Sequence, residues 1–226
     1  MASPRFQRHD DLSAALGQDY FLAADVDFST LAADLAALPG PCIVDLRILG
    51  ADIDHARTLV RQGFLKICLL AMFDIELLGP KPEAAPAPEA AVSRDASWIA
   101  RHADNLRLGC FALNPHISDA AWLAVHHGLV EKSLASPDVG KLFLEDGFVS
   151  FRVHEDKAVI DFFSVLAGRR GTGSALMARL FDFARSRGVR HIEVVTECEN
   201  VPACLFYQKS GFRLTQTACI FHYHKN

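Results

Sequence analysis

The chain has 226 residues, half of them apolar, and a formal net charge of −4 at pH 7. This length and apolar content can supply a sizeable core, in one large domain or two small ones. The charge offers no basic excess to neutralise phosphate backbones, so a nucleic-acid partner is not expected.

Neither export nor membrane insertion is expected. The N-terminus, Met1–Asp10, lacks the apolar run of a signal peptide. The most apolar stretch, residues 64–78, is interrupted by Lys66, Asp74 and Glu76. It is also shorter than the roughly 20 residues that a membrane span requires. We interpret it as a buried strand.

The cysteines and histidines favour a cytoplasmic protein without a metal. Six cysteines lie far apart and form no Cys-x-x-Cys pair, which favours reduced, mostly buried thiols. His222 and His224 would share one face of a strand, but no third ligand lies near them in the sequence.

The first half reads as a small α/β unit. Residues 41–48 predict a buried strand, residues 52–62 an amphipathic helix that Gly63 closes, and residues 64–77 at least one further strand. The apolar positions of the helix fall on one side: Ile53, Ala56, Leu59 and Val60. We find no glycine-rich anion loop or catalytic cluster in this half.

A proline-rich segment follows, with four prolines in residues 79–93 that favour an extended path. We therefore predict an N-terminal α/β domain (1–78), a linker (79–93) and a second domain (94–226).

The second domain has well-marked elements. Helices are predicted at 96–102 and 119–136, and an antiparallel meander at 141–145, 148–154 and 158–166. A helix (174–187), a strand (191–198), a helix (202–209) and a last strand (215–224) follow.

A glycine-rich turn connects the meander to the helix, in the run Val165-Leu-Ala-Gly-Arg-Arg-Gly-Thr-Gly-Ser174. Glycines let backbone N–H groups approach an anion, and the positive end of the helix dipole lies behind them. The meander before the turn argues against a Rossmann fingerprint, and the Gly-Lys-Ser/Thr of a Walker loop is absent. We predict an anion cradle made of Arg169, Arg170, Gly171, Thr172, Gly173 and Ser174.

A second motif lies in residues 197–212, where five residues fit the pattern Asn-x-x-Ala-x-x-x-Tyr-x-x-x-Gly-Phe without a gap. They are Asn200, Ala203, Tyr207, Gly211 and Phe212. With the glycine turn and the meander, this motif resembles the GCN5-related N-acetyltransferase (GNAT) family, whose acyl-CoA loop reads Gln/Arg-x-x-Gly-x-Gly/Ala. The resemblance implies an α/β fold with a mixed, mainly antiparallel sheet flanked by helices, and acetyl-CoA as co-substrate. It also implies that the anion cradle is a pyrophosphate cradle, which binds the pyrophosphate of the coenzyme.

The register of the glycine loop stays open. It reads either as Arg170-x-x-Gly173-x-Ala175 or as Gly168-x-x-Gly171-x-Gly173 without the leading arginine. Within the superfamily, the chain most resembles the TDP-fucosamine acetyltransferase type, which acetylates a nucleotide-linked aminodeoxysugar. A degenerate first half, a compressed loop and the Phe111…Asn114-Pro115 stretch carry this likeness, although Asn114 and Cys110 depart from the usual pattern.

The resemblance also implies roles for individual residues. Tyr207 would be the general acid, since a phenol with a pKa near 10 is protonated at neutral pH. A backbone N–H of Val165 or Leu166 would contact the oxyanion, and Asn200 would help to bind the coenzyme. The candidates for a general base are Asp161, Glu197 and Glu199, among which the sequence does not choose. His116, His126 and His127 fall in the acceptor region.

The acceptor is expected to be a small-molecule primary amine, with a dTDP-linked aminosugar as the first choice. Two alternatives stay open: a GNAT enzyme that acts on another small amine, an amino acid or a peptide N-terminus, and a non-catalytic acyl-CoA-binding domain. The sequence determines neither the acyl chain length nor the oligomeric state, and a homodimer is compatible with it.

Overall fold

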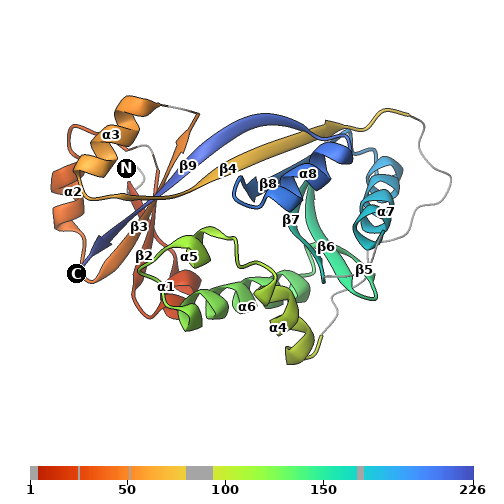
Figure 1. The fold of residues 1–226 in the computed structure, drawn as a ribbon, viewed down its shortest axis with the longest axis horizontal. Coiled ribbons are helices and arrows are strands. Elements are labelled where there is room, and N and C mark those ends of the chain that lie inside the picture. Colours follow the sequence, from red (N-terminus) through yellow and green to blue (C-terminus); the bar gives the residue numbers. More distant parts are fainter. Residues whose placement is uncertain (1–4, 25, 51, 80–93, 167–170) are drawn as a thin grey trace.

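A computed structural model describes residues 5–24, 26–50, 52–79, 94–166 and 171–226. In this part of the chain nine strands form a single sheet in the order β1-β2-β3-β9-β4-β8-β7-β6-β5 (Figure 1). The strands are β1 (Phe6–Arg8), β2 (Asp19–Ala23), β3 (Cys42–Leu49), β4 (Leu65–Glu76), β5 (Gly140–Leu144), β6 (Gly147–His154), β7 (Lys157–Val165), β8 (His191–Glu197) and β9 (Arg213–Lys225).

Helices cover both faces of this sheet, as predicted. They are α1 (Asp10–Leu16), α2 (Leu31–Ala37), α3 (Ile53–Arg61), α4 (Ala96–Asp104), α5 (Cys110–Leu113), α6 (Asp119–Ala135), α7 (Thr172–Ser186) and α8 (Val201–Lys209). All neighbouring strands are antiparallel except β2–β3 and β7–β8. The predicted mixed, mainly antiparallel α/β architecture is thus confirmed.

Two long strands join the N-terminal and C-terminal parts. β9 pairs with β3 through Ala218–Lys225 and, on its other edge, with β4 through Arg213–His222. β4 comes from before the proline-rich segment but lies between β8 and β9, which come after it (Figure 1). The division at residues 79–93 stays a prediction about folding units, but the sheet is continuous across it.

The predicted elements of the second half agree with the observed ones to within a few residues. Gly188 and Gly211 follow α7 and α8 with φ values of 76° and 95°, the left-handed conformation expected where glycine ends a helix. The first 40 residues carry four elements that we had not predicted: β1, α1, β2 and α2. Each has at most seven residues, too few to show a clear period.

The packing of side chains shows which face of the sheet each helix covers. On β3, Cys42, Val44 and Leu46 pack in the cluster that contains α2 and α3 residues, whereas Ile43 packs with α1, α5 and α6. The largest cluster joins α7 and α8 to the strands β4 to β8. In the described residues, no helix is both long and apolar enough to cross a membrane.

Candidate functional site

The neighbouring strands β7 and β8 pair only over their first residues. Their parallel register runs from Lys157↔His191 to Ile160↔Val194 and then ends. On the other side of β7, Ile160 pairs with Phe151 while Phe162 pairs with Ser150, so Asp161 is an extra residue in the ladder. Such a bulge bends its strand and interrupts pairing. The bulge at Asp161 therefore coincides with the point where the two strands separate.

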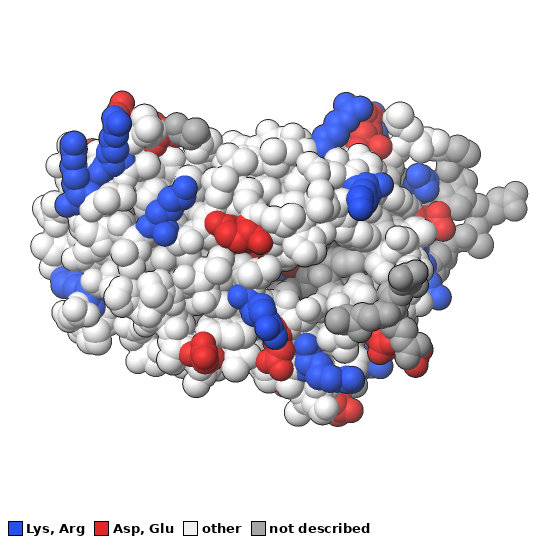
Figure 2. All heavy atoms as spheres, in the orientation of Figure 1, with Lys and Arg blue, Asp and Glu red and all other residues white. Residues whose placement is uncertain are grey.

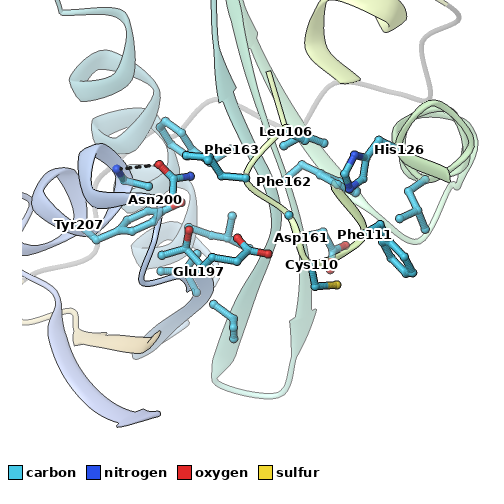
Figure 3. A pocket seen from close by; sticks show the side chains of 18 residues that line it. Leu106, Cys110, Phe111, His126, Asp161, Phe162, Phe163, Glu197, Asn200 and Tyr207 are labelled. Atoms are coloured by element: carbon cyan, nitrogen blue, oxygen red, sulfur yellow. Dashed lines mark hydrogen bonds between the residues drawn. The ribbon is translucent and has the colours of Figure 1, made fainter. Parts of the chain in front are cut away.

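A cavity of about 240 Å³ lies at this separation. Its walls come from β7, β8 and α8 on one side and from the loop before α5, α5 itself and α6 on the other (Figure 3). The lining residues are Leu106, Leu108, Gly109, Cys110, Phe111, His126, Leu129, Ile160, Asp161, Phe162, Phe163, Val194, Val195, Thr196, Glu197, Asn200, Ala203 and Tyr207.

Two of the three candidate bases lie in this cavity. Figure 3 shows the Glu197 carboxylate between Asn200 and Tyr207 on one side and Cys110 on the other. Burial raises the pKa of Glu197, opposed by backbone hydrogen bonds and the Arg47 charge. Burial also raises the pKa of Asp161, whose carboxylate forms an ion pair with Arg152 at 3.2 Å.

Glu199 is not among the residues that line the cavity. Its carboxylate accepts a hydrogen bond from the Leu69 amide at 3.4 Å, on the neighbouring strand β4. Of the three histidines predicted near the acceptor, His126 lines the cavity. Burial lowers the pKa of His126 to about 4, so its ring is neutral at pH 7. The ring of His116 instead lies 4.9 Å from that of His224.

Tyr207 lies on α8 at the wall of the cavity and is only 5% exposed. Its ring packs among aromatic side chains, with centroid distances of 6.0 Å to Phe73, 6.3 Å to Phe163 and 5.6 Å to Phe212. Burial raises the phenol's pKa, and negative charge on Cys204 and Glu197 would raise it further. The hydroxyl therefore keeps its proton throughout the neutral range.

Asn200 is the N-cap of α8. Its Oδ1 accepts a hydrogen bond from the Ala203 amide at 3.3 Å, and Pro202 occupies the first turn. A capping side chain reaches the amide three residues on, which explains the Asn-x-x-Ala spacing. The cap starts the helix at the cavity and places Tyr207 two turns further along.

The predicted pyrophosphate cradle lies partly in the described residues. Arg169 and Arg170 lie outside them. Gly171, with φ 97°, is the N-cap of α7, and no side chain caps the helix. The first amides of a helix have no partner within it, so those of Thr172, Gly173 and Ser174 can receive an anion. A Cβ on Gly173 would lie 3.2 Å from Phe206 Cε2, so this glycine lets α7 pack close to α8.

The structure distinguishes the two amides proposed for the oxyanion. The Leu166 amide donates to the carbonyl of Asp146 at 2.8 Å. Because successive residues of a strand direct their amides to opposite sides, the Val165 amide points away from β6. The Val165 carbonyl accepts from Asn105 Nδ2 at 3.1 Å. The peptide group between residues 165 and 166 is therefore fixed by hydrogen bonds at both its carbonyl and its N–H.

Asn114, which departs from the expected aspartate, joins α5 to β9. It is buried, and its Nδ2 lies 2.7 Å from His222 Nδ1 and 3.0 Å from His224 Nε2. Its Oδ1 accepts from the His116 amide at 2.9 Å. These contacts attach the cavity wall to the strand that crosses both parts of the sheet.

The sequence did not reveal the wall opposite Glu197. Leu106, Cys110 and Phe111 come from short or loop segments and Leu129 comes from α6, and their apolar side chains look like ordinary core in the sequence. Asn105 was missed for a similar reason, since an asparagine after a helix is common. Only the pairing of distant segments brings these side chains to one cavity.

Part of the chain matches a known protein family. Residues 141–212 match the model of the acetyltransferase (GNAT) family. A stretch of 68 residues, 30% of the chain, is 31% identical to the uncharacterized protein YxbD of Bacillus subtilis (strain 168). This match covers 43% of that protein, less than half of its length.

Solved structures resemble the whole chain. One is a functionally unknown conserved protein from Staphylococcus epidermidis ATCC 12228, with a TM-score of 0.62 and 12% identity, covering 100% of this chain and 93% of that one. Another is a GCN5-related N-acetyltransferase from Sphaerobacter thermophilus, with a TM-score of 0.58 and 15% identity, covering 97% and 75%. At these identities the likeness shows the fold. The chain therefore has a GNAT-like fold, and residues 141–212 are the part of it that matches the acetyltransferase (GNAT) family.

Proposed function

We propose that this protein is an N-acetyltransferase that moves an acetyl group from acetyl-CoA to a primary amine by direct attack in a ternary complex. The observation that carries the proposal is the separation of β7 from β8 at Asp161, with Tyr207 and Glu197 in the cavity. The start of α7 is close by, since a Cβ on Gly173 would lie 3.8 Å from Phe163 of the lining. A thioester held there would have an anion site for its pyrophosphate and a proton donor for its sulfur.

The reaction needs three contributions from the chain. Glu197 accepts a proton from the amine, whose nitrogen attacks the thioester carbonyl. The Val165 amide stabilises the oxyanion that forms, because the Leu166 amide is already bonded to Asp146. Tyr207 protonates the thiolate as the C–S bond breaks, which leaves an acetamide and free CoA.

We choose Glu197 as the base on two observations. The Asp161 carboxylate forms an ion pair with Arg152, which stabilises its charged form and reduces its basicity. Glu199 bonds to β4 outside the cavity lining. Glu197 lines the cavity, and burial raises its pKa, so it can take up a proton there.

The acceptor that we propose is a nucleotide-linked aminodeoxysugar, on the sequence resemblance to TDP-fucosamine acetyltransferases. Other small amines, amino acids and peptide N-termini are the alternative. A thiol-release assay with acetyl-CoA against a panel of these amines tests the proposal. Thiol release with an aminosugar supports both the acetyl transfer and the proposed acceptor. Release with another amine supports only the acetyl transfer. Coenzyme binding without release from any amine would indicate a binding domain.

Gly171→Ala is expected to weaken acetyl-CoA binding about tenfold and to lower the free energy of unfolding by about 1 kcal/mol, because an L side chain is strained at φ 97°. Gly188→Ala is the matched control. Gly188 also has a positive φ (76°) with open space around a Cβ, but it follows the other end of α7. Equilibrium binding and thermal unfolding of both variants check this. Equal effects on binding would exclude a special role for the loop.

Asn105→Ala is expected to lower kcat about tenfold with little change in the KM for acetyl-CoA. The Asn105 side chain bonds to the Val165 carbonyl and to Ser164 Oγ, both at 3.1 Å, so its loss frees the strand end that presents the Val165 amide. The neighbouring exposed residue supplies the control, Asp104→Ala. Steady-state kinetics check this, and an unchanged kcat would remove Asn105 from the positioning of β7.

A further inference from the structure

An apolar groove runs along one side of α3, far from the cavity described above. Two hollows of about 200 and about 320 Å³ lie along this helix. Both are lined by Ile53, Ala56 and Phe221, so they form one continuous groove. Its accessible lining is almost entirely apolar, although Arg57, Arg61 and Lys66 border it.

The apolar side of α3 is covered only in part. Leu59 is buried, but Ile53 and Val60 are 61% and 58% exposed. These two residues are seven apart, which is about two helical turns, so they form a ridge along the groove. Leu49, at the end of β3, is also 58% exposed. Exposed apolar patches larger than usual are found at sites where a protein binds a partner.

The charges on α3 run from acidic to basic. Asp52 and Asp54 lie at its start, and Arg57 and Arg61 lie towards its end. Asp54 and Arg57 form an ion pair within the helix at 3.6 Å, and their side chains are still 88% and 64% exposed. Figure 2 shows basic side chains gathered over the part of the molecule that α3 occupies in Figure 1.

This arrangement is complementary to itself. When two α3 helices lie antiparallel, the acidic start of each meets the basic end of the other, and the ridge of each faces the groove of the other. A parallel arrangement would bring like charges together. A two-fold axis generates the antiparallel arrangement, since residue i then contacts j and j contacts i.

We propose that two copies of this chain associate through α3 about a two-fold axis, with the Ile53 and Val60 ridge of each copy seated in the groove of the other. The occupant is a second copy rather than an acidic or basic partner, because the helix carries both charges in head-to-tail order. This inference does not depend on the proposed acetyltransferase activity.

Sedimentation velocity of the full chain over a concentration series tests the proposal. The wild type is expected to be dimeric. Val60→Lys should raise the dimer dissociation constant about 100-fold, because it places a charge in an apolar contact. Leu214→Lys is the matched control, since Leu214 is 52% exposed at the far end of β9. Thermal unfolding verifies that both variants are folded.

Charge reversal separates this interface from any other. Asp54→Lys and Arg61→Asp should each weaken the dimer about tenfold, and the double variant should restore it. A monomeric wild type at all concentrations would overturn the proposal. So would a dimer that Val60→Lys leaves intact, or a double variant no tighter than the single ones.

Discussion

Tyr207→Phe is expected to lower kcat about 100-fold or more while acetyl-CoA binds as before. The phenol supplies the proton that the departing thiolate needs, and a general acid contributes about 100- to 10,000-fold. Phenylalanine keeps the ring that packs against Phe73, Phe163 and Phe212, so the fold should not change. Single-turnover kinetics with acetyl-CoA and a productive amine measure the effect.

The pH profile sharpens this test. Because burial raises the pKa of Tyr207 above its ordinary 10.0, the acid form persists to the alkaline end of an assay, and no loss of kcat from this group is expected below that value. Tyr223→Phe is the matched control, since Tyr223 packs against Phe64 on the α3 side of the sheet. If both variants keep full activity, another donor protonates the thiolate. Full loss of coenzyme binding in Tyr207→Phe would instead indicate a structural role.

Glu197→Gln is expected to lower kcat/KM about 100-fold at pH 7, because the amide cannot take a proton from the amine. In the wild type, kcat/KM should rise with pH as Glu197 ionises, at a pH above its ordinary 4.5 because burial raises its pKa. The variant should lose this limb of the profile. The matched control is Glu199→Gln, which makes the same substitution at a residue outside the cavity lining.

As pH rises, the free energy of unfolding should fall where kcat/KM rises. A carboxyl whose pKa is raised in the folded state binds more protons there than in the unfolded chain, so its contribution to stability falls as pH rises from 4.5 through the raised value. Glu197→Gln removes this cost, and its melting temperature at pH 7 should be equal to or above that of the wild type. A lower melting temperature would mean that Glu197 is a structural residue, and an unchanged pH profile would reassign the base.

Several features of the site follow from local sequence. The Asn-x-x-Ala spacing is a helix cap, in which Asn200 Oδ1 accepts from the Ala203 amide. The positive φ of Gly171 belongs to a turn that only glycine enters at low cost. The spacing of apolar residues in the meander and in the helix after it identifies these elements without knowledge of what they pack against. The same local signals predicted α3, but not that Ile53 and Val60 would stay exposed.

What the sequence determined by itself is therefore the order of elements in the second half, the glycine turn, and Tyr207 on a capped helix. The residues that specify each of these features are close neighbours in the sequence. The tertiary structure alone decided that β4 lies between β8 and β9, that Asp161 forms a bulge, and that Glu197 rather than Glu199 enters the cavity. These features depend on strand pairing and burial between residues far apart in the chain, for which a single sequence carries no local signal.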